Sequence, residues 1–288
     1  MFHIRLKEMR LAAKKTQKEL ADYLNLSPQS VSKWEKGEVL PSLEYLPKLA
    51  EFFHCDINTF FQDSIEEVDI VKEKRITDLV FILDRSGSMS GMESDTIGGF
   101  NAMIEKQKME EGEAFVSTVL FNNHSKFLHD RVPIHQVSAM SRDDYRVGGG
   151  TALFDAIGHA IRRIKAAQEA DSLTDSKESI KHQTVFVITT DGRENASRDF
   201  RGSYVKAMIR EMQKSYGWEF LFMAANIDAM EAADNLGICP DRTSSYNVRE
   251  STGTLFYETA TTLSEFRNTG KIRKDWAKKL EEENSPKK

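Results

Sequence analysis

The sequence predicts two domains, a small all-α domain followed by an α/β domain with a doubly wound parallel sheet. Its 288 residues are enough for two hydrophobic cores. Residues 1–63 show helical periodicity with recognisable helix starts. Residues 76–269 alternate short apolar runs with amphipathic segments, as expected for a sheet covered by helices on both faces. A charged connector at 64–75 separates the two domains, and a charged tail follows at 270–288.

Two helix starts define the middle of the first domain. Thr16, with Glu19 three residues later, is the pattern of a capping box. Ser27 and Pro28 mark the next helix, with a hydroxyl at the cap and proline in the first turn. Asn25 tolerates the left-handed conformation that a tight turn between these helices requires. The segment therefore predicts a helix-turn-helix.

A fourth helix is expected after Ser42, which we place at its cap. Its core face should consist of five apolar side chains, Leu43, Leu46, Leu49, Ala50 and Phe53. A short fifth helix is expected over 57–61. Five helices in about 60 residues can form a small independent domain.

The helix that begins at Pro28 is expected to present polar side chains to solvent. Val31 and Trp34 are three residues apart and point inward. The outer face then holds Gln29, Ser32, Lys33 and Lys36. Amide and ammonium groups can reach base edges, Gln to adenine and Lys to guanine. Residues 1–37 contain eight basic and four acidic residues, whereas residues 38–64 contain one basic and five acidic residues. The basic part of the domain would therefore face a polyanion.

Three polar stretches of the second domain are expected at one edge of its sheet. Apolar runs at 79–83 and 185–188 predict strands buried on both faces, and they lead into Asp84 and Asp191. A third stretch, Gly148 to Thr151, precedes an amphipathic helix. Because the carboxyl ends of parallel strands meet at one edge, the three stretches should converge there.

These stretches supply five oxygen-bearing side chains, Asp84, Ser86, Ser88, Thr151 and Asp191. Hard oxygen donors without His or Cys suit Mg²⁺, Ca²⁺ or Mn²⁺ and argue against Zn²⁺ or Cu²⁺. If the hydroxyls bind the ion and the aspartates act through water, little negative charge touches the metal, and it would accept a carboxylate from outside. For the first stretch taken alone, a strand-to-helix turn with capping hydroxyls is the alternative.

In this order and spacing, the five side chains resemble the metal-ion-dependent adhesion site of von Willebrand factor A domains. The resemblance covers 76–269 and implies a Rossmann-like fold. It implies that the three hydroxyls hold Mg²⁺ while the two aspartates hold waters and hydroxyls in place. It also implies a protein partner that contributes an Asp or Glu carboxylate to the ion. Arg85, Arg193 and Glu194 would line the rim of the site and select that partner.

Residues 3–62 resemble the phage repressor/Cro-like (Xre) family of DNA-binding domains, notably in Thr16–Ala21 and Ser30–Gly37. The resemblance implies that the third helix enters the major groove of duplex DNA, and we expect a dimer on two half-sites. It implies DNA contacts from Gln17, Gln29 and Lys33, to which the outer face adds Ser32 and Lys36. Arg10 and Glu35 match a structural ion pair of that family.

The second domain lacks the signatures of common enzymes built on such a sheet. No Gly-x-Gly-x-x-Gly follows its first strand, and no phosphate loop ends in Gly-Lys-Ser/Thr. Ser86 stands where haloacid-type phosphatases place a second carboxylate, and the seven His residues form no catalytic pattern, so we expect no enzyme. The preferred hypothesis is a DNA-binding transcriptional regulator with a divalent-metal-dependent protein-interaction domain. The alternatives are an adaptor whose amino-terminal helices do not bind DNA and a metal-dependent hydrolase.

The composition is that of an ordinary globular protein, with 40% apolar and 30% charged residues. No apolar run approaches the ~20 residues that span a bilayer, and the first residues lack a signal core. We therefore expect no membrane partner and a cytoplasmic location. Cys55 and Cys239 match no metal or redox spacing, which fits a reducing compartment.

Overall fold

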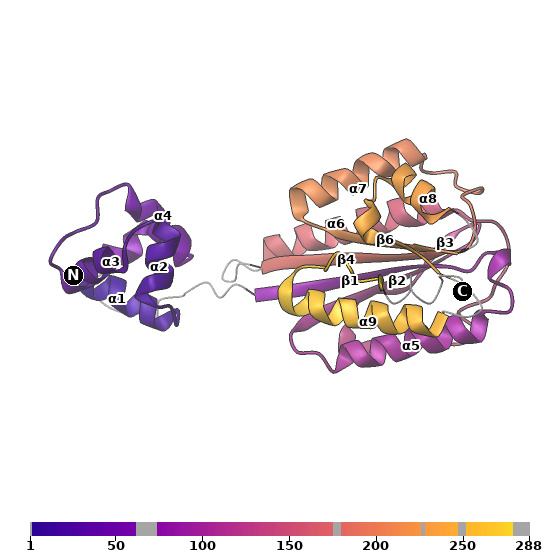
Figure 1. Cartoon of the computed structure of the whole chain (residues 1–288), viewed down its shortest axis with the longest axis horizontal. Coiled ribbons are helices and arrows are strands. Elements are labelled where there is room, and N and C mark those ends of the chain that lie inside the picture. Colours follow the sequence, from indigo (N-terminus) through magenta and orange to yellow (C-terminus); the bar gives the residue numbers. More distant parts are fainter. Residues whose placement is uncertain (1, 62–73, 175–179, 226–227, 247–251, 279–288) are drawn as a thin grey trace. The chain divides into compact units, whose positions relative to one another are not determined.

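The computed structural model (Figure 1) describes residues 2–61, 74–174, 180–225, 228–246 and 252–278. The chain divides into two compact units, which are described separately: Met1–Lys74 with Ser172–Ile180, and Arg75–Asp171 with Lys181–Lys288. The predicted connector at 64–75 lies almost wholly outside the described residues.

The amino-terminal unit consists of short helices. They are α1 (Phe2–Ala12), α2 (Gln17–Leu24), α3 (Pro28–Lys36), α4 (Tyr45–Phe52) and the 3-10 helix η1 (Ile57–Phe61). The capping box is confirmed, because Thr16 Oγ1 accepts from the Glu19 amide and Glu19 Oε2 accepts from the Thr16 amide. Ser27 accepts from the amide of Ser30, and Asn25 is left-handed at φ 55°. The turn between α2 and α3 therefore forms as the sequence predicts.

The core of this unit lies between the helices, but it excludes one predicted member. Its buried apolar side chains are Leu6, Met9, Leu20, Ala21, Leu24, Val31, Trp34, Leu49, Ala50, Phe53 and Phe60. Leu43 was expected among them and is instead 81% exposed. The reason is that α4 begins only at Tyr45, so Leu43 lies in the turn ahead of the helix. Ser42 does not cap α4, since its hydroxyl donates to Glu44 Oε1.

The second unit contains a six-stranded sheet of order β3-β2-β1-β4-β5-β6. The strands are β1 (Lys74–Asp84), β2 (Glu113–Phe121), β3 (Ser125–Pro133), β4 (Ile180–Thr190), β5 (Glu219–Ala224) and β6 (Thr243–Ser245). The pairs β1–β2, β4–β5 and β5–β6 are parallel. The pair β2–β3 is antiparallel. The sheet is thus mixed rather than wholly parallel, because the connection at 122–124 is too short for a crossover and forms a hairpin.

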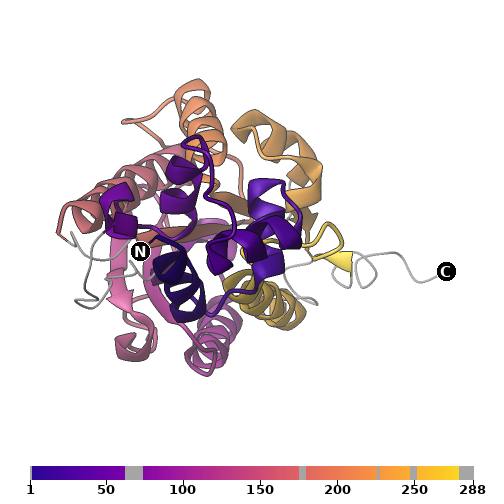
Figure 2. The ribbon, with the colours of Figure 1, turned by 90° about the vertical axis from the view of Figure 1, so that its left-hand side faces the viewer.

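Helices cover both faces of the sheet, as the view along the strands shows (Figure 2). One face carries α5 (Glu93–Lys108) and α9 (Thr252–Thr269); the other carries α6 (Leu153–Thr174), α7 (Gly202–Tyr216) and α8 (Ala229–Leu236). Successive residues of β1 alternate between the two cores. Leu79, Phe81 and Leu83 pack with α5 and α9, whereas Val80 and Ile82 pack with the other three helices. The continuous apolar run is therefore buried on both faces, as predicted.

The second unit extends past the boundary predicted at 269. Ile272, Trp276 and Ala277 belong to the core that packs against α5 and α9. The charged tail was placed at 270–288, but burial of these apolar side chains attaches its first part to the domain. In the described parts of the chain, no helix is both long and apolar enough to cross a membrane.

Candidate functional site

Three hydroxyl oxygens surround one point at the carboxyl edge of the sheet. A methyl group added at Gly192 would lie 3.1 Å from Thr151 Oγ1, 3.4 Å from Ser88 Oγ and 4.0 Å from Ser86 Oγ. The two serine hydroxyls are 3.0 Å apart. Ser86 and Ser88 lie in the loop after β1, and Thr151 lies just before α6. Gly192 lies in the loop after β4, which ends at Thr190. We call Ser86, Ser88 and Thr151 the hydroxyl cradle.

Both predicted aspartates reach the cradle. Ser88 Oγ donates to Asp191 Oδ1 over 2.5 Å, and the amide of Ser86 donates to Asp84 Oδ1 over 2.7 Å. Asp84, Ser86, Thr151 and Asp191 are all buried, and Ser88 is more open to solvent. The structure therefore places the five predicted metal-site residues together.

The two carboxylates lie close enough to affect one another. Burial raises the pKa of Asp84, against hydrogen bonds from Thr190 and Ser86 that lower it. Burial also raises the pKa of Asp191, and the negative charge of Asp84 raises it further. Asp191 Oδ2 is buried and, within the described residues, has no hydrogen-bond partner. Two buried carboxylates and an unpaired oxygen beside three hydroxyls form a donor set that a small divalent cation would satisfy.

The cradle differs from a metal site of imidazole and thiolate ligands. Across the described ranges, no group of three or more His, Cys, Asp and Glu side chains could hold a metal ion. Here only two carboxylates contribute, and hydroxyls complete the set. Such neutral oxygen donors suit Mg²⁺ or Mn²⁺ more than Zn²⁺. They would leave net positive charge on a bound ion if the aspartates act through water.

Two residues that the sequence analysis did not assign to the site hold Asp84 in place, Thr190 and Tyr145. Thr190 Oγ1 donates to Asp84 Oδ2 over 2.6 Å, while the Ser86 amide donates to the other oxygen, Oδ1. The hydroxyl of Tyr145, which is fully buried, donates to the Asp84 carbonyl. Thr190 immediately precedes Asp191, so its position next to a predicted ligand was a usable signal. Tyr145 gave none, because it lies 61 residues from Asp84 in the chain.

The glycine stretch before Thr151 is tied through its backbone to the loop after β1. The amide of Gly148 donates to the Arg85 carbonyl, and the amide of Gly87 donates to the Gly149 carbonyl, both over 3.0 Å. Gly149 has φ 84°, and a Cβ there would lie 2.8 Å from Asn123 Nδ2. Glycine is therefore required both by the left-handed backbone and by the close approach of the loop after β2.

Two asparagines complete the loop cluster. Asn123 Oδ1 accepts from the amide of Gly150 over 2.6 Å, and Asn195 Oδ1 accepts from the amide of Thr151 over 2.9 Å. These side chains come from the loops after β2 and β4. They position the backbone next to Thr151 and so aim its hydroxyl. Neither was singled out in the sequence, although both follow predicted strands.

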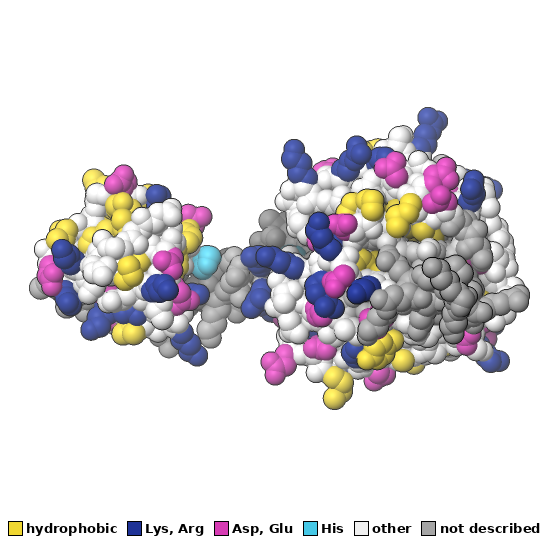
Figure 3. Space-filling model, in the orientation of Figure 1, with side chains coloured by type: hydrophobic (Ala, Val, Ile, Leu, Met, Phe, Trp, Pro, Cys, Tyr) yellow, Lys and Arg dark blue, Asp and Glu magenta, His cyan; other side chains and the backbone are white. Residues whose placement is uncertain are grey.

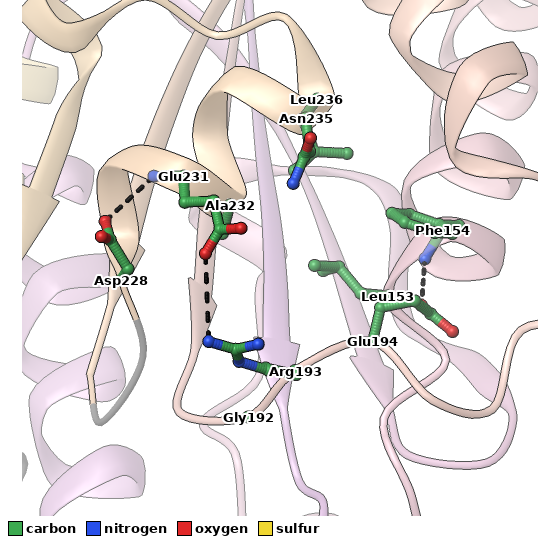
Figure 4. Close-up of a pocket in the computed structure, with 10 residues that line it drawn as sticks. All are labelled: Leu153, Phe154, Gly192, Arg193, Glu194, Asp228, Glu231, Ala232, Asn235 and Leu236. Carbon is green, nitrogen blue, oxygen red and sulfur yellow. Dashed lines mark hydrogen bonds and ion pairs between the residues drawn. The ribbon is translucent and has the colours of Figure 1, made fainter.

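The three predicted rim residues differ in their surroundings. The Arg193 side chain is 76% exposed, and its Nη2 lies 3.9 Å from Glu231 Oε2 (Figure 4). Glu194 instead accepts hydrogen bonds from the amide of Phe154 and from the amide and hydroxyl of Ser197. Its carboxylate therefore fixes the start of α6. Arg85 is half-buried, and its Nε has no hydrogen-bond partner among the described residues.

The amino-terminal unit places four predicted DNA-contacting residues on one short helix. Gln29, Lys33 and Lys36 of α3 are exposed, and Ser32 is half-buried. Lys36 has one loose ion pair, with Glu38 at 4.0 Å. Figure 3 shows acidic and basic side chains on the visible face of this unit. Attraction to a polyanion would therefore depend on the local arrangement of a few lysines.

Gln17, the fifth predicted DNA contact, is connected to a buried ion pair. Arg10 forms a two-point pair with Glu35, with Nε to Oε1 at 2.6 Å and Nη2 to Oε2 at 2.9 Å. The side-chain amide of Gln17 donates to the same Glu35 Oε2 over 2.8 Å. The structure thus pairs Arg10 with Glu35 and holds the half-buried Gln17 side chain against them.

The two units match two protein families. A von Willebrand factor type A domain model matches residues 78–259, and a helix-turn-helix model matches residues 6–60. The chain thus combines an amino-terminal helix-turn-helix with an α/β domain whose sheet edge holds the hydroxyl cradle. It belongs to the von Willebrand factor type A family.

Similar proteins of known name or structure match one unit at a time. The HTH-type transcriptional activator BcrR of Enterococcus faecalis is 35% identical over 57 residues, which are 20% of this chain and 28% of that protein. The cryptic phage CTXphi transcriptional repressor RstR of Vibrio cholerae is 41% identical over 54 residues, 19% of this chain and 48% of that protein. Proximal thread matrix protein 1 from the mussel byssus has 12% identity and a TM-score of 0.46, over 68% of this chain and 50% of that one. The chain spans half or less of the length of each.

Proposed function

We propose that the protein is a DNA-binding transcriptional regulator whose second domain binds a divalent cation and, through it, a carboxylate of a protein partner. The observation that supports this most directly is the hydroxyl cradle beside the unpaired Asp191 Oδ2. Mg²⁺ is the cation that the donor set suits best, with Mn²⁺ or Ca²⁺ as substitutes.

In this proposal each side chain has a separate task. The hydroxyls of Ser86, Ser88 and Thr151 would bind the ion. Asp84 and Asp191 would hold its waters and supply most of the electrostatic attraction, since the hydroxyls have no formal charge. A bound cation would supply an electrophilic position for an Asp or Glu of the partner. We propose binding rather than catalysis, because the sequence has none of the phosphate-binding motifs of common enzymes built on such a sheet.

The amino-terminal unit supports the DNA-binding part of the proposal. Gln29, Lys33 and Lys36 lie exposed on α3, which follows α2 after the three residues 25–27. Side chains at these positions can reach base edges and phosphates when α3 lies in the major groove. The relatives named as a transcriptional activator and a repressor match this unit alone, so the direction of regulation is left open.

Titration of the full chain with Mg²⁺ and Mn²⁺ tests the metal site. Asp84→Ala should abolish binding and Thr151→Ala should weaken it, while both variants keep the wild-type circular dichroism spectrum. Asp143→Ala is a matched control, because Asp143 is an exposed carboxylate outside the cradle. Equal binding by wild type and Asp84→Ala would refute the site. Turnover of phosphoesters that depends on both metal and Asp84 would instead indicate a hydrolase.

A further inference from the structure

A small pocket adjoins the hydroxyl cradle and has no role in the proposed metal site. It has a volume of about 180 Å³ and lies between the loop after β4, the start of α6 and helix α8 (Figure 4). Its apolar wall consists of Leu153, Phe154, Ala232 and Leu236. Small-molecule sites usually enclose ~300–1,000 Å³. The pocket is therefore suited to one side chain rather than to a whole cofactor.

The pocket and the cradle share a wall. Gly192 lines the pocket, and it is also the residue whose Cβ position would stand over the three hydroxyls. Leu153, at the start of α6, comes two residues after the cradle residue Thr151. Neighbouring residues of a peptide are about 3.8 Å apart at Cα. A peptide with a carboxylate at the cradle would thus place a side chain from a nearby position at the pocket.

The charged groups around the pocket are mainly acidic. Three carboxylates, from Glu194, Asp228 and Glu231, line it together with a single cation, Arg193. Asp228 Oδ1 caps α8 by accepting from the Glu231 amide, which holds this carboxylate at the pocket mouth. The Glu231 side chain is 63% exposed and available to solvent. An apolar wall under an acidic mouth complements a long side chain with an aliphatic stem and a cationic end.

We propose that this pocket binds a lysine or arginine of the same partner, within a few residues of the carboxylate that binds the metal. The proposal rests on the proposed metal-dependent capture of that carboxylate. The aliphatic stem lies against Leu153 and Leu236, and the cationic end meets Glu231 and Asp228. The pocket thereby restricts the partner to segments in which an acidic residue stands close to a basic one.

The internal partner of Glu231 does not prevent this binding. Arg193 lies 3.9 Å from Glu231, at the outer limit of an ion pair, and both side chains are mostly exposed. Such surface pairs contribute little to stability, so a partner cation can replace Arg193 at small cost. Arg193 is then free to turn towards the acidic residue of the partner.

A random peptide library displayed on phage, selected on the 288-residue chain in Mg²⁺, tests the proposal. The expected peptides contain Asp or Glu with Lys or Arg one to three positions away. Replacing that basic residue by Leu in a synthetic peptide should weaken binding about fivefold, as expected for an ion pair at a partly exposed mouth. Glu231→Lys should remove the preference for a basic residue. Asp234→Lys should keep it, because Asp234 lies on the same helix but outside this pocket.

The outcomes separate the pocket from the metal site. Acidic peptides that enrich in Mg²⁺ and disappear with chelator, but show no basic preference, would overturn the pocket and leave the metal-dependent function standing. A basic preference that is lost in Glu231→Lys but survives chelation would support the pocket and refute the role of the metal. Selection of no acidic peptide would overturn both.

Discussion

At the scale of single residues, the hydroxyl cradle depends on the absence of a side chain at Gly192. The point where a Cβ would stand is 3.1 Å from Thr151 Oγ1 and 3.4 Å from Ser88 Oγ. A divalent cation needs close approach to these oxygens, about 2.0–2.1 Å for Mg²⁺. The backbone at Gly192 does not have positive φ, so alanine is conformationally acceptable there.

Gly192→Ala should therefore lower Mg²⁺ affinity at least about tenfold, an effect of about 1.4 kcal/mol, without unfolding the domain. The added methyl would lie within 4.0 Å of all three hydroxyl oxygens and so would occupy space that the ion or its waters need. Calorimetric titration and a thermal melt measure the two quantities. Gly98→Ala is the control, because a Cβ at Gly98 meets nothing within 4 Å. Wild-type affinity in Gly192→Ala would contradict this placement of the ion.

The buried pair of Arg10 and Glu35 provides a second prediction at the residue scale. Their side chains are only 9% and 2% exposed, and Gln17 adds a further hydrogen bond to Glu35. Arg10→Ala would leave the buried Glu35 carboxylate without its counter-charge. The free energy of unfolding of this unit should fall by about 3–5 kcal/mol. Amide exchange of the full chain should show faster exchange in α1 and α3. Lys18→Ala, an exposed change on α2, should leave exchange unaltered.

The same pair predicts how this unit responds to acid. Burial alone would raise the pKa of Glu35, but hydrogen bonds from Arg10 and Gln17 bring the pKa below its usual value. A carboxylate with a lowered folded pKa contributes stability that is complete above the unfolded value of about 4.5. That contribution is lost as the pH falls through the folded pKa. Amide-exchange protection of α1 and α3 should therefore fall in acid. Protection that stays constant below pH 4 would contradict this contribution of Glu35 to stability.

At the scale of elements, two adjacent glycines in α5 face different surroundings. A Cβ at Gly99 would lie 2.1 Å from Phe256 Cδ2 of α9, whereas one at Gly98 meets open space. Gly99 thus allows α5 and α9 to pack closely on one face of the sheet. The two positions form a matched pair within one helix.

Gly99→Ala should destabilise the α/β unit by about 1–3 kcal/mol, because the methyl would force Phe256 or the helix to move. Gly98→Ala should stabilise it by up to about 1 kcal/mol, since alanine is the better helix former. Urea unfolding of the full chain followed by circular dichroism compares the two. Equal effects of both changes would show that α9 does not pack on α5 in this way.

The elements also show how much the sequence alone could predict. Local signals were reliable where a few adjacent residues determine the outcome, as in the capping box at Thr16 and the apolar run that ends at Asp84. Leu43 was misplaced because hydrophobic periodicity does not say where a helix begins. Tyr145 and Asn123 could not be assigned, since their roles depend on loops that meet only after the sheet has formed.

At the scale of the whole molecule, one chain joins a helix-turn-helix unit to an α/β unit that holds the hydroxyl cradle. The predicted DNA contacts Gln29, Lys33 and Lys36 lie in the first unit and the five metal-site residues in the second. A change in either set should therefore affect only its own ligand. The effect of these changes on DNA binding therefore separates two hypotheses. A regulator binds DNA through the first unit and a protein partner through the second, whereas an adaptor binds proteins through both units.

The corresponding experiment uses a duplex selected from a random library by the full chain. Lys33→Ala should weaken specific DNA binding by about 1–3 kcal/mol if Lys33 contacts a base. Lys36→Ala should reduce the slope of the logarithm of the binding constant against the logarithm of salt concentration by about one if Lys36 contacts a phosphate. Both variants should keep wild-type Mg²⁺ titrations. Asp84→Ala should lose Mg²⁺ and acidic-peptide binding yet keep wild-type DNA affinity. If the folded chain enriches no duplex at low salt, the adaptor hypothesis replaces the regulator hypothesis. A change of DNA affinity in Asp84→Ala would show that the two sites are coupled.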